Sequence, residues 1–166
     1  MKPAEILADA QAGLDDTIEL RRRIHRHPEL GLALPRTQAT ALEAIDGLGL
    51  DVRTGTKTTS VVARLTGDKP GPTILLRGDM DALPMREDTG LPFASEVDGA
   101  MHACGHDAHV AMLVGAARQL ARRRAAHAGS VVFMFQPGEE GYHGARVMLE
   151  EGLLEHAPTV DAAFAI

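Results

Sequence analysis

The sequence has few aromatic residues and almost no cysteine. Its 166 residues include no Trp, one Tyr and four Phe, so aromatic residues make up only 3% of the chain. Because 45% of the residues are hydrophobic, the chain can still bury a core, and that core must be mainly aliphatic. A single cysteine excludes an internal disulfide and suits a reducing compartment. The length predicts one domain of ordinary size.

Long apolar runs and an excess of positive charge are absent as well. No run of about eighteen apolar residues occurs, and the N-terminal residues lack the apolar stretch of a signal peptide. We therefore expect no membrane partner and a cytoplasmic location. The net charge of −6 gives no support for a nucleic-acid partner, since such proteins are usually basic. The one basic cluster, residues 122–124, ends a predicted helix, where cations complement the helix dipole.

The strongest chemical signal is the segment MHACGHDAHV at residues 101–110. It holds the only cysteine and three of the eight histidines of the chain. Cys104, His106, Asp107 and His109 place four candidate ligands within six residues. Thiolate, imidazole and carboxylate bind zinc or a neighbouring divalent metal, whereas calcium and magnesium prefer oxygen ligands alone. The alternative interpretation is a structural cysteine beside incidental histidines.

The spacing within this segment predicts its local structure. Cys104 and His106 are two residues apart, so their side chains share one side only if the backbone is extended. We expect the pair on a loop or strand end, with Gly105 allowing the backbone to bend. Residues 107–124 lack proline and are rich in Ala, Leu and Arg, which predicts a helix. Asp107 would then lie near the unpaired amides of the helix N-terminus.

The remaining patterns predict an α/β fold with a largely parallel sheet, because strands and helices alternate along the chain. A second His-x-His pair, His25 and His27, lacks an accompanying cysteine or carboxylate pair, so we interpret it as structural or substrate-facing rather than metal-binding. Helices are expected at 3–26, where a break is left open, and at 37–48 and 144–154; a turn is expected at 67–71, and strands at 51–53, 60–65, 73–77, 130–135 and 160–166.

Two acidic pairs directly follow predicted buried strands. Asp79 and Asp81 come after residues 73–77, and Glu139 and Glu140 come after residues 130–135. The carboxyl ends of parallel strands are where open α/β sheets place their sites. Adjacent side chains diverge, so one glutamate can bind a metal while its neighbour takes a proton from water. The alternatives are a turn with local Asp hydrogen bonds and a solvated acidic turn.

Four segments together carry a family resemblance: RRRIHRHPELG, LLRGDMDALPM, MHACGHDAHVAML and FMFQPGEEGYHGA. In this order and spacing they closely resemble the dinuclear-metal amidohydrolases typified by hippurate hydrolase, N-acyl-L-amino-acid amidohydrolase and the plant auxin–amino-acid conjugate hydrolases. These enzymes belong to the aminoacylase/carboxypeptidase metallopeptidase superfamily. The resemblance extends from about residue 18 to the end of the chain.

The resemblance implies roles for particular residues. Cys104, His106 and Glu140 match metal ligands, and Glu139 matches the general base that activates water. Asp81 matches a catalytic-site aspartate that we interpret as orienting a ligand, while Asp79 stands where the wider superfamily has a histidine ligand. The implied cofactors are two divalent ions, zinc or manganese. The implied fold is a zinc-peptidase-like three-layer α/β/α catalytic domain, interrupted by a smaller lid domain that often dimerises.

Length is the main departure from this family. Its members are longer and supply further histidine ligands, so we expect residues 1–166 to be the N-terminal part of the catalytic domain, incomplete at the C-terminus and without the lid. The leading hypothesis is a metal-dependent amidohydrolase acting on small N-acyl amino acids or related peptide-like substrates, forming a homo-oligomer when full-length. The alternatives are a truncated, non-catalytic metal-binding domain and, more weakly, a hydrolase with Cys104 as nucleophile.

Overall fold

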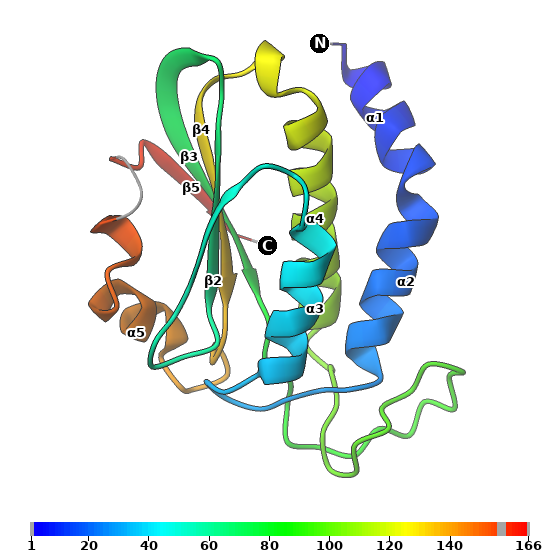
Figure 1. Ribbon diagram of the computed structural model, residues 1–166. Coiled ribbons are helices and arrows are strands. Elements are labelled where there is room, and N and C mark those ends of the chain that lie inside the picture. Colours follow the sequence, from blue (N-terminus) through cyan, green and yellow to red (C-terminus); the bar gives the residue numbers. More distant parts are fainter. Residues whose placement is uncertain (1, 156–158, 166) are drawn as a thin grey trace.

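The computed structural model describes residues 2–155 and 159–165 (Figure 1). It has a single sheet with helices on both faces. In chain order the elements are α1 (Pro3–Ala12), α2 (Leu14–His25), α3 (Pro35–Ile45), β1 (Asp51–Thr54), β2 (Val61–Thr66), β3 (Lys69–Asp79), α4 (His106–Arg122), the 3-10 turn η1 (Arg124–Ala126), β4 (Ala128–Gln136), α5 (Gly144–Glu150), the 3-10 turn η2 (Leu153–Glu155) and β5 (Ala162–Ala165).

The sheet has five strands in the order β1-β2-β4-β3-β5. Strand β3 pairs in parallel with β4 and β5, whereas β2 pairs antiparallel with β1 and β4. Four strands therefore run in one direction, which confirms the predicted largely parallel sheet. Strand β2 is the exception because the short connections on either side of it leave no room for a crossover helix, which a parallel pairing of consecutive strands needs.

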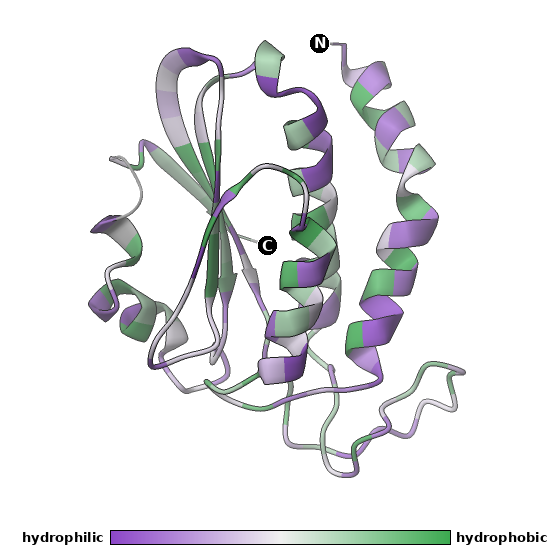
Figure 2. Ribbon diagram, viewed as in Figure 1, coloured by the Kyte–Doolittle hydropathy of each residue, from purple (hydrophilic) through white to green (hydrophobic). Residues whose placement is uncertain are grey.

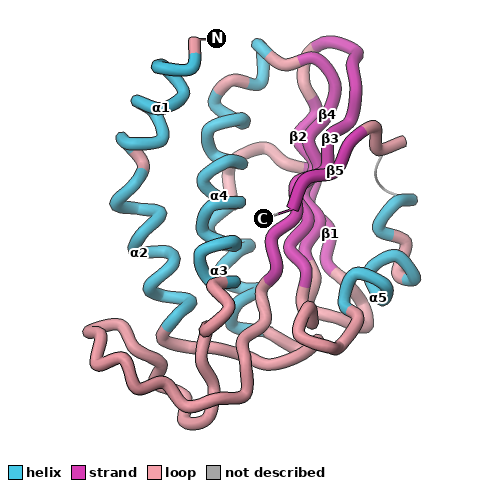
Figure 3. The backbone as a smooth tube through the Cα atoms, turned by 180° about the vertical axis from the view of Figure 1, so that it is seen from behind, coloured by secondary structure: helices cyan, strands magenta, loops and turns pink. Residues whose placement is uncertain are grey.

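Three layers are visible when the sheet is viewed edge-on. Helices α2, α3 and α4 cover one face, and α5 lies on the other (Figures 1 and 3). The main core lies between the sheet and α4, where Phe133 and Phe135 of β4 are fully buried among aliphatic side chains. Hydrophobic residues accordingly line the inner faces of the strands and helices (Figure 2). The predicted α/β/α arrangement and mainly aliphatic core are confirmed. No helix in the described part of the chain is long and apolar enough to span a membrane.

The break left open in the first predicted helix occurs at Gly13, and none of the residues of α1, all of them described, is buried. Other predicted boundaries need correction. Strand β3 begins at Lys69, inside the predicted turn, and its pairing with β4 is irregular between Lys69 and Thr73. That irregularity accommodates Pro70, which cannot donate to a regular ladder. Helix α5 ends at Glu150, before the predicted end at 154, and is followed by η2. The last predicted strand extends to Ile166, which lies outside the described residues.

Parallel pairing places the ends of β3 and β4 together. Asp79, the last residue of β3, lies in register with Gln136, the last residue of β4. Helix α4, which packs on β3, begins with His106 at the same edge. The segments that carry the acidic pairs and the Cys-x-His pair therefore leave the sheet layer at one edge, as the sequence predicts.

A carboxylate on the opposite face of the sheet holds α5 against the β1–β2 turn. Glu151 accepts hydrogen bonds from the backbone N–H of Thr56 at 2.6 Å, the backbone N–H of Lys57 and the hydroxyl of Thr58 at 2.8 Å. Burial favours the neutral acid, but these hydrogen bonds outweigh burial and lower the pKa of Glu151. The ionised side chain is therefore a structural acceptor.

We expect the substitution Glu151→Gln to lower the free energy of unfolding by about 1 kcal/mol at neutral pH, because the acceptor loses its charge. The pKa is lower in the folded chain than its ordinary value near 4.5, so the contribution is complete above that value and is lost as pH falls through the folded pKa. Urea unfolding at several pH values measures this. Glu150→Gln, beside exposed Arg146, is the control; an equal loss in both variants at every pH would contradict the assignment.

Candidate metal centre

Three of the predicted ligands lie close together at the edge where β3 and β4 end. Single donor atoms of Cys104, His106 and Glu140 all lie within 4.8 Å of one another. Cys104 lies on the loop before α4, His106 is the first residue of α4, and Glu140 follows β4. A thiol, an imidazole and a carboxylate at this spacing match the donor set of a zinc-like divalent ion. The chemistry of the residues present therefore fits such a metal.

The backbone between the first two donors bends at Gly105, as the sequence predicts. Gly105 has φ of +85°, a left-handed conformation that L side chains rarely adopt. No atom lies within 4 Å of the position a Cβ would occupy there, so the glycine is needed for its conformation and not for space. The bend lets Cys104 and His106 contribute to one site, although the second residue already belongs to a helix.

The His106 ring contacts Asp81, which lies two residues beyond the end of β3. Its Nδ1–H donates to the carbonyl oxygen of Asp81 at 2.7 Å. A carbonyl can only accept, so Nε2 is the nitrogen left to bind a metal. Burial disfavours the charged ring, yet the contact with Asp81 and the charge of Asp79 outweigh burial and raise the pKa of His106. A bound cation at Nε2 would replace the proton that these carboxylates favour.

The Asp81 carboxylate holds the backbone of the Glu139–Glu140 pair. Its Oδ1 accepts from the N–H of Glu139 at 2.9 Å, and its Oδ2 accepts from the N–H of Glu140 at 3.0 Å. The residue is buried, and burial alone would raise its pKa; the hydrogen bonds from His106 and the two glutamate amides lower it. Asp81 therefore contacts the backbone of the loop after β4 through its carboxylate and the His106 ring of α4 through its carbonyl.

The charges around Cys104 favour a cation. Burial, a hydrogen bond with Glu140 and the negative charges of Glu140, Asp79 and Glu139 raise the pKa of the Cys104 thiol. A cysteine nucleophile needs the opposite shift, so this environment argues against Cys104 as a nucleophile. Glu139, with its side chain 41% exposed, places Oε2 at 3.8 Å from His106 Nε2 but is not part of the Cys104 group.

A second donor group also includes His106. Asp79, His106 and His109 also bring donor atoms within 4.8 Å. The Asp79 carboxylate, however, already accepts from His109 Nδ1 at 2.6 Å and pairs with Arg77 at 2.9 Å, and the His109 ring stacks on His106. Sequence reasoning named Asp79 and His109 but missed Arg77, whose place two residues before Asp79 on one strand puts both side chains on the same side.

Asp107 lies in the first turn of α4, as predicted, but its contacts are with helix α2. Its buried Oδ2 accepts from Arg21 Nε at 2.9 Å and from His25 Nδ1 at 2.7 Å. His25 is accordingly buried and paired, which supports the structural interpretation of that residue. His27 is partly exposed, with Nδ1 at 3.9 Å from Glu96. The pattern His-x-His carries no information on these partners, which lie far away in the sequence.

His102, in the same motif as Cys104, is in neither donor group among the described residues. It is buried, and within the part of the chain that the structure describes neither of its ring nitrogens has a hydrogen-bond partner. Burial is the main reason why the pKa of His102 is lowered to about 4. The ring is therefore neutral at physiological pH.

We expect Asp81→Asn to loosen the Glu139–Glu140 backbone, because an amide side chain offers one acceptor oxygen where the carboxylate offers two. Hydrogen exchange at the amides of residues 139 and 140 should accelerate relative to the parent, and metal affinity should fall by about tenfold. NMR-detected exchange and metal titration measure the two effects. Asp161→Asn, at the distant start of β5, is the control; unchanged exchange in Asp81→Asn would show that the contact does not hold the backbone.

Comparison with known proteins identifies relatives of this arrangement. The family model described as Peptidase family M20/M25/M40 matches residues 75–166. Thermostable carboxypeptidase 1 of Saccharolobus solfataricus is 44% identical over 155 residues, which cover 92% of this chain and 39% of the relative. The N-acetylcysteine deacetylase of Bacillus subtilis is 45% identical over 138 residues, covering 82% of this chain and 36% of the relative. The chain thus spans about two-fifths of the length of these curated relatives.

A solved structure resembles this chain in both fold and sequence. A Bacillus subtilis protein described as a dinuclear metal-binding peptidase from the M20 family superposes with a TM-score of 0.86 at 42% identity, covering 93% of this chain and 43% of that one. The family model matches more than half of the residues, and it includes all of the candidate ligands and both acidic pairs. This chain belongs to peptidase family M20/M25/M40.

Proposed function

We propose that this chain carries part of the active site of a metal-dependent amidohydrolase, which cleaves the amide bond of N-acyl amino acids or related peptide-like substrates. The observation that supports it most is the convergence of Cys104, His106 and Glu140, with Glu139 adjacent but outside the donor group. Names of relatives such as N-acetylcysteine deacetylase and N-acyl-L-amino acid amidohydrolase support the substrate class.

The division of roles follows from the contacts. Cys104, His106 and Glu140 would hold a divalent ion, zinc or manganese, which supplies Lewis acidity toward water and the scissile carbonyl when bound. Glu139 accepts a proton from the attacking water and delivers it to the departing amine nitrogen. Asp81 keeps Glu139 in place through its backbone amide and keeps His106 in place through its carbonyl. The catalytic assignment is therefore Glu139 as base with Asp81 in support.

A cavity beside Glu139 has a size that suits a small substrate. Its volume is about 560 Å³, and Arg77, Gln136, His143 and Phe164 contribute to its lining. Small-molecule sites commonly have volumes of roughly 300–1,000 Å³. The Phe164 ring fits an acyl group, and the polar lining fits an amino-acid carboxylate; Arg77 in this lining also contacts Gln136 and Asp79.

We further infer that residues 1–166 are the N-terminal part of a longer catalytic metallohydrolase domain, without the lid domain. The fraction of each relative that the chain matches supports this inference. A second metal ion, additional ligands and a homo-oligomer would then belong to the longer protein. A cytoplasmic location stays a prediction.

Metal binding by this chain can be tested with Co²⁺, whose thiolate complexes have a charge-transfer absorption. We expect Co²⁺ to produce that absorption in the parent and to protect Cys104 from alkylation, since the thiol is otherwise exposed. Cys104→Ser should abolish the absorption, and Glu140→Gln should weaken binding by tenfold or more. Glu150→Gln, an exposed glutamate on α5, is the control. Alkylation at the same rate with and without metal would contradict the site.

The role of Glu139 is separable from metal binding. We expect Glu139→Gln to bind Co²⁺ as the parent does, because its side chain is outside the donor group, while hydrolysis of an N-acetyl amino acid falls by at least about a hundredfold. Amine release with added Zn²⁺ or Mn²⁺ measures the activity. A parent chain that binds metal but releases no amine would favour the alternative of a metal-binding domain without catalysis.

A further inference from the structure

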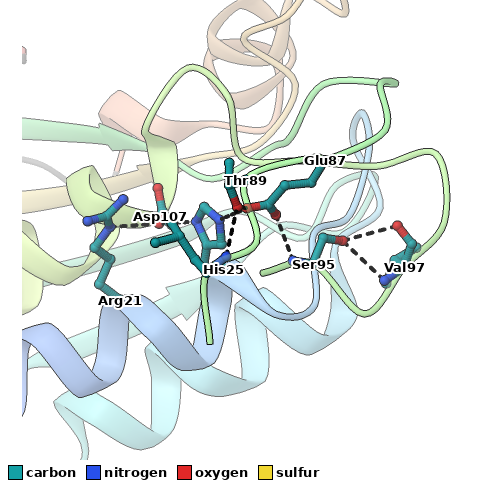
Figure 4. A network of polar contacts seen from close by, with 8 residues as sticks. Arg21, His25, Glu87, Thr89, Ser95, Val97 and Asp107 are labelled. Atoms are coloured by element: carbon teal, nitrogen blue, oxygen red, sulfur yellow. Dashed lines mark hydrogen bonds and ion pairs between the residues drawn. The ribbon is translucent and has the colours of Figure 1, made fainter. Parts of the chain in front are cut away.

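A buried chain of polar contacts lies behind the candidate metal centre. The Asp107 carboxylate receives Arg21 Nε at 2.9 Å and His25 Nδ1 at 2.7 Å through one oxygen, Oδ2. The other ring nitrogen of His25 lies 3.3 Å from Glu87 Oε1. Figure 4 shows the His25 ring between the two carboxylates, with Arg21 beyond Asp107. One imidazole therefore joins helix α2 to two acidic residues that are twenty positions apart in the sequence.

Burial makes these contacts energetically important. The side chain of Asp107 is fully buried, and those of His25 and Glu87 are 4% and 3% exposed. Removing one partner of a buried hydrogen bond leaves the other polar group unsatisfied, which destabilises the native arrangement. Arg21 reaches the same carboxylate from a position where its own side chain is 42% exposed. Asp107 therefore has little freedom to move relative to α2.

The contacts flank the candidate ligands on both sides. Asp107 directly follows His106 on α4. Glu87 accepts from the Ser95 N–H at 2.6 Å and from the Thr89 hydroxyl, so it closes the segment 84–99 on itself. This segment leads along the chain to Cys104 and projects from the end of the molecule where α2 and α4 meet it (Figure 1).

Aromatic packing holds the same segment on α2. The Phe93 ring meets His25 edge-on, with centroids 5.4 Å apart, and Arg22 places its guanidinium 5.1 Å from that ring. The N–H of Glu96 also donates to the carbonyl of Arg26 at 2.8 Å. The segment that leads to Cys104 and the residue after His106, Asp107, therefore both contact the C-terminal end of α2. Helix α2 itself supplies no member of either donor group in the described chain.

We propose that His25 and Asp107 are positioning residues for the metal ligands: the His25–Asp107 contact fixes the first turn of α4, and with it the distance between His106 and Cys104. The proposal rests on the metal site of the proposed function and adds that helix α2 sets the metal affinity. Contacts outside the ligand set commonly affect metal affinity by about 10–100-fold. The Nδ1 contact to Asp107 is the decisive one, because Asp107 is adjacent to a ligand.

Two amide substitutions separate the two nitrogens of His25. In His25→Asn the side-chain nitrogen lies near the position of Nδ1 and can still donate to Asp107. In His25→Gln it lies near the position of Nε2 and reaches only toward Glu87. We expect Co²⁺ binding to weaken by about tenfold in His25→Gln and by less than about threefold in His25→Asn. His27→Gln, two residues away and partly exposed, is the matched control and should bind as the parent does.

The readouts distinguish positioning from stability. Metal-free unfolding in urea gives the folded fraction of each variant, and Co²⁺ affinity is measured where that fraction is complete. The d–d absorption of bound Co²⁺ should change in His25→Gln, because ligand geometry changes, and not in His27→Gln. If His25→Gln does not fold, Arg21→Met removes the Nε–H donor to the same Asp107 oxygen at a half-exposed position and should weaken Co²⁺ binding severalfold.

The outcomes are distinct. A parent chain that binds Co²⁺ through Cys104, with equal affinity in His25→Gln and His25→Asn, would overturn the positioning role and leave the proposed metal site intact. Parent affinity in Arg21→Met would overturn it in the same way if His25→Gln cannot be measured. A parent that fails to bind Co²⁺ would overturn the metal site, and this proposal with it. Weaker binding in His25→Gln with rescue in His25→Asn would establish the role.

Discussion

The arrangement at the candidate metal centre depends on the parallel pairing of β3 with β4. That pairing places Asp79 opposite Gln136, so the chain leaves both strands at the same level of the sheet. Two residues beyond the first strand, the Asp81 carboxylate can then span the amides of Glu139 and Glu140. A register shift of one residue would turn these side chains to opposite faces and separate the acids from the edge where α4 begins.

The same pairing brings four carboxylates to one edge of the sheet, and in the part of the chain that the structure describes only some of them have close cationic or backbone hydrogen-bonding partners. Asp79 is paired with Arg77 and His109, and Asp81 is hydrogen-bonded to backbone amides. Glu139 and Glu140 have no comparable cationic partner in the described chain beyond His106 Nε2, at 3.8 and 3.9 Å. Burial, together with this excess of negative charge, raises the pKa of Cys104. A divalent cation would relieve it, so the electrostatics and the donor geometry support the same interpretation.

Sequence reasoning predicted the parts of this site that depend on local pattern. The strands before Asp79 and Glu139, the bend at Gly105 and the helix after it follow from hydrophobic runs, glycine and helix propensity, which are properties of neighbouring residues. The contact between His25 and Asp107 joins residues 82 positions apart, and no local pattern encodes it. The early start of β3 also depends on its pairing with β4, which propensity does not describe.

The two halves of the site are therefore supported from different layers. Asp81 lies just after β3, at the edge of the sheet. Its hydrogen bonds hold Glu139, Glu140 and the His106 ring. The first turn of α4, which begins at His106, and the segment that leads to Cys104 are held instead by contacts with α2, which packs mainly on α4. Because a metal ligand must be held to within a fraction of an ångström, either support alone would leave one donor free to shift. In the proposed metal site, α2 thus has a positioning role, although that helix contributes no candidate ligand in the described chain.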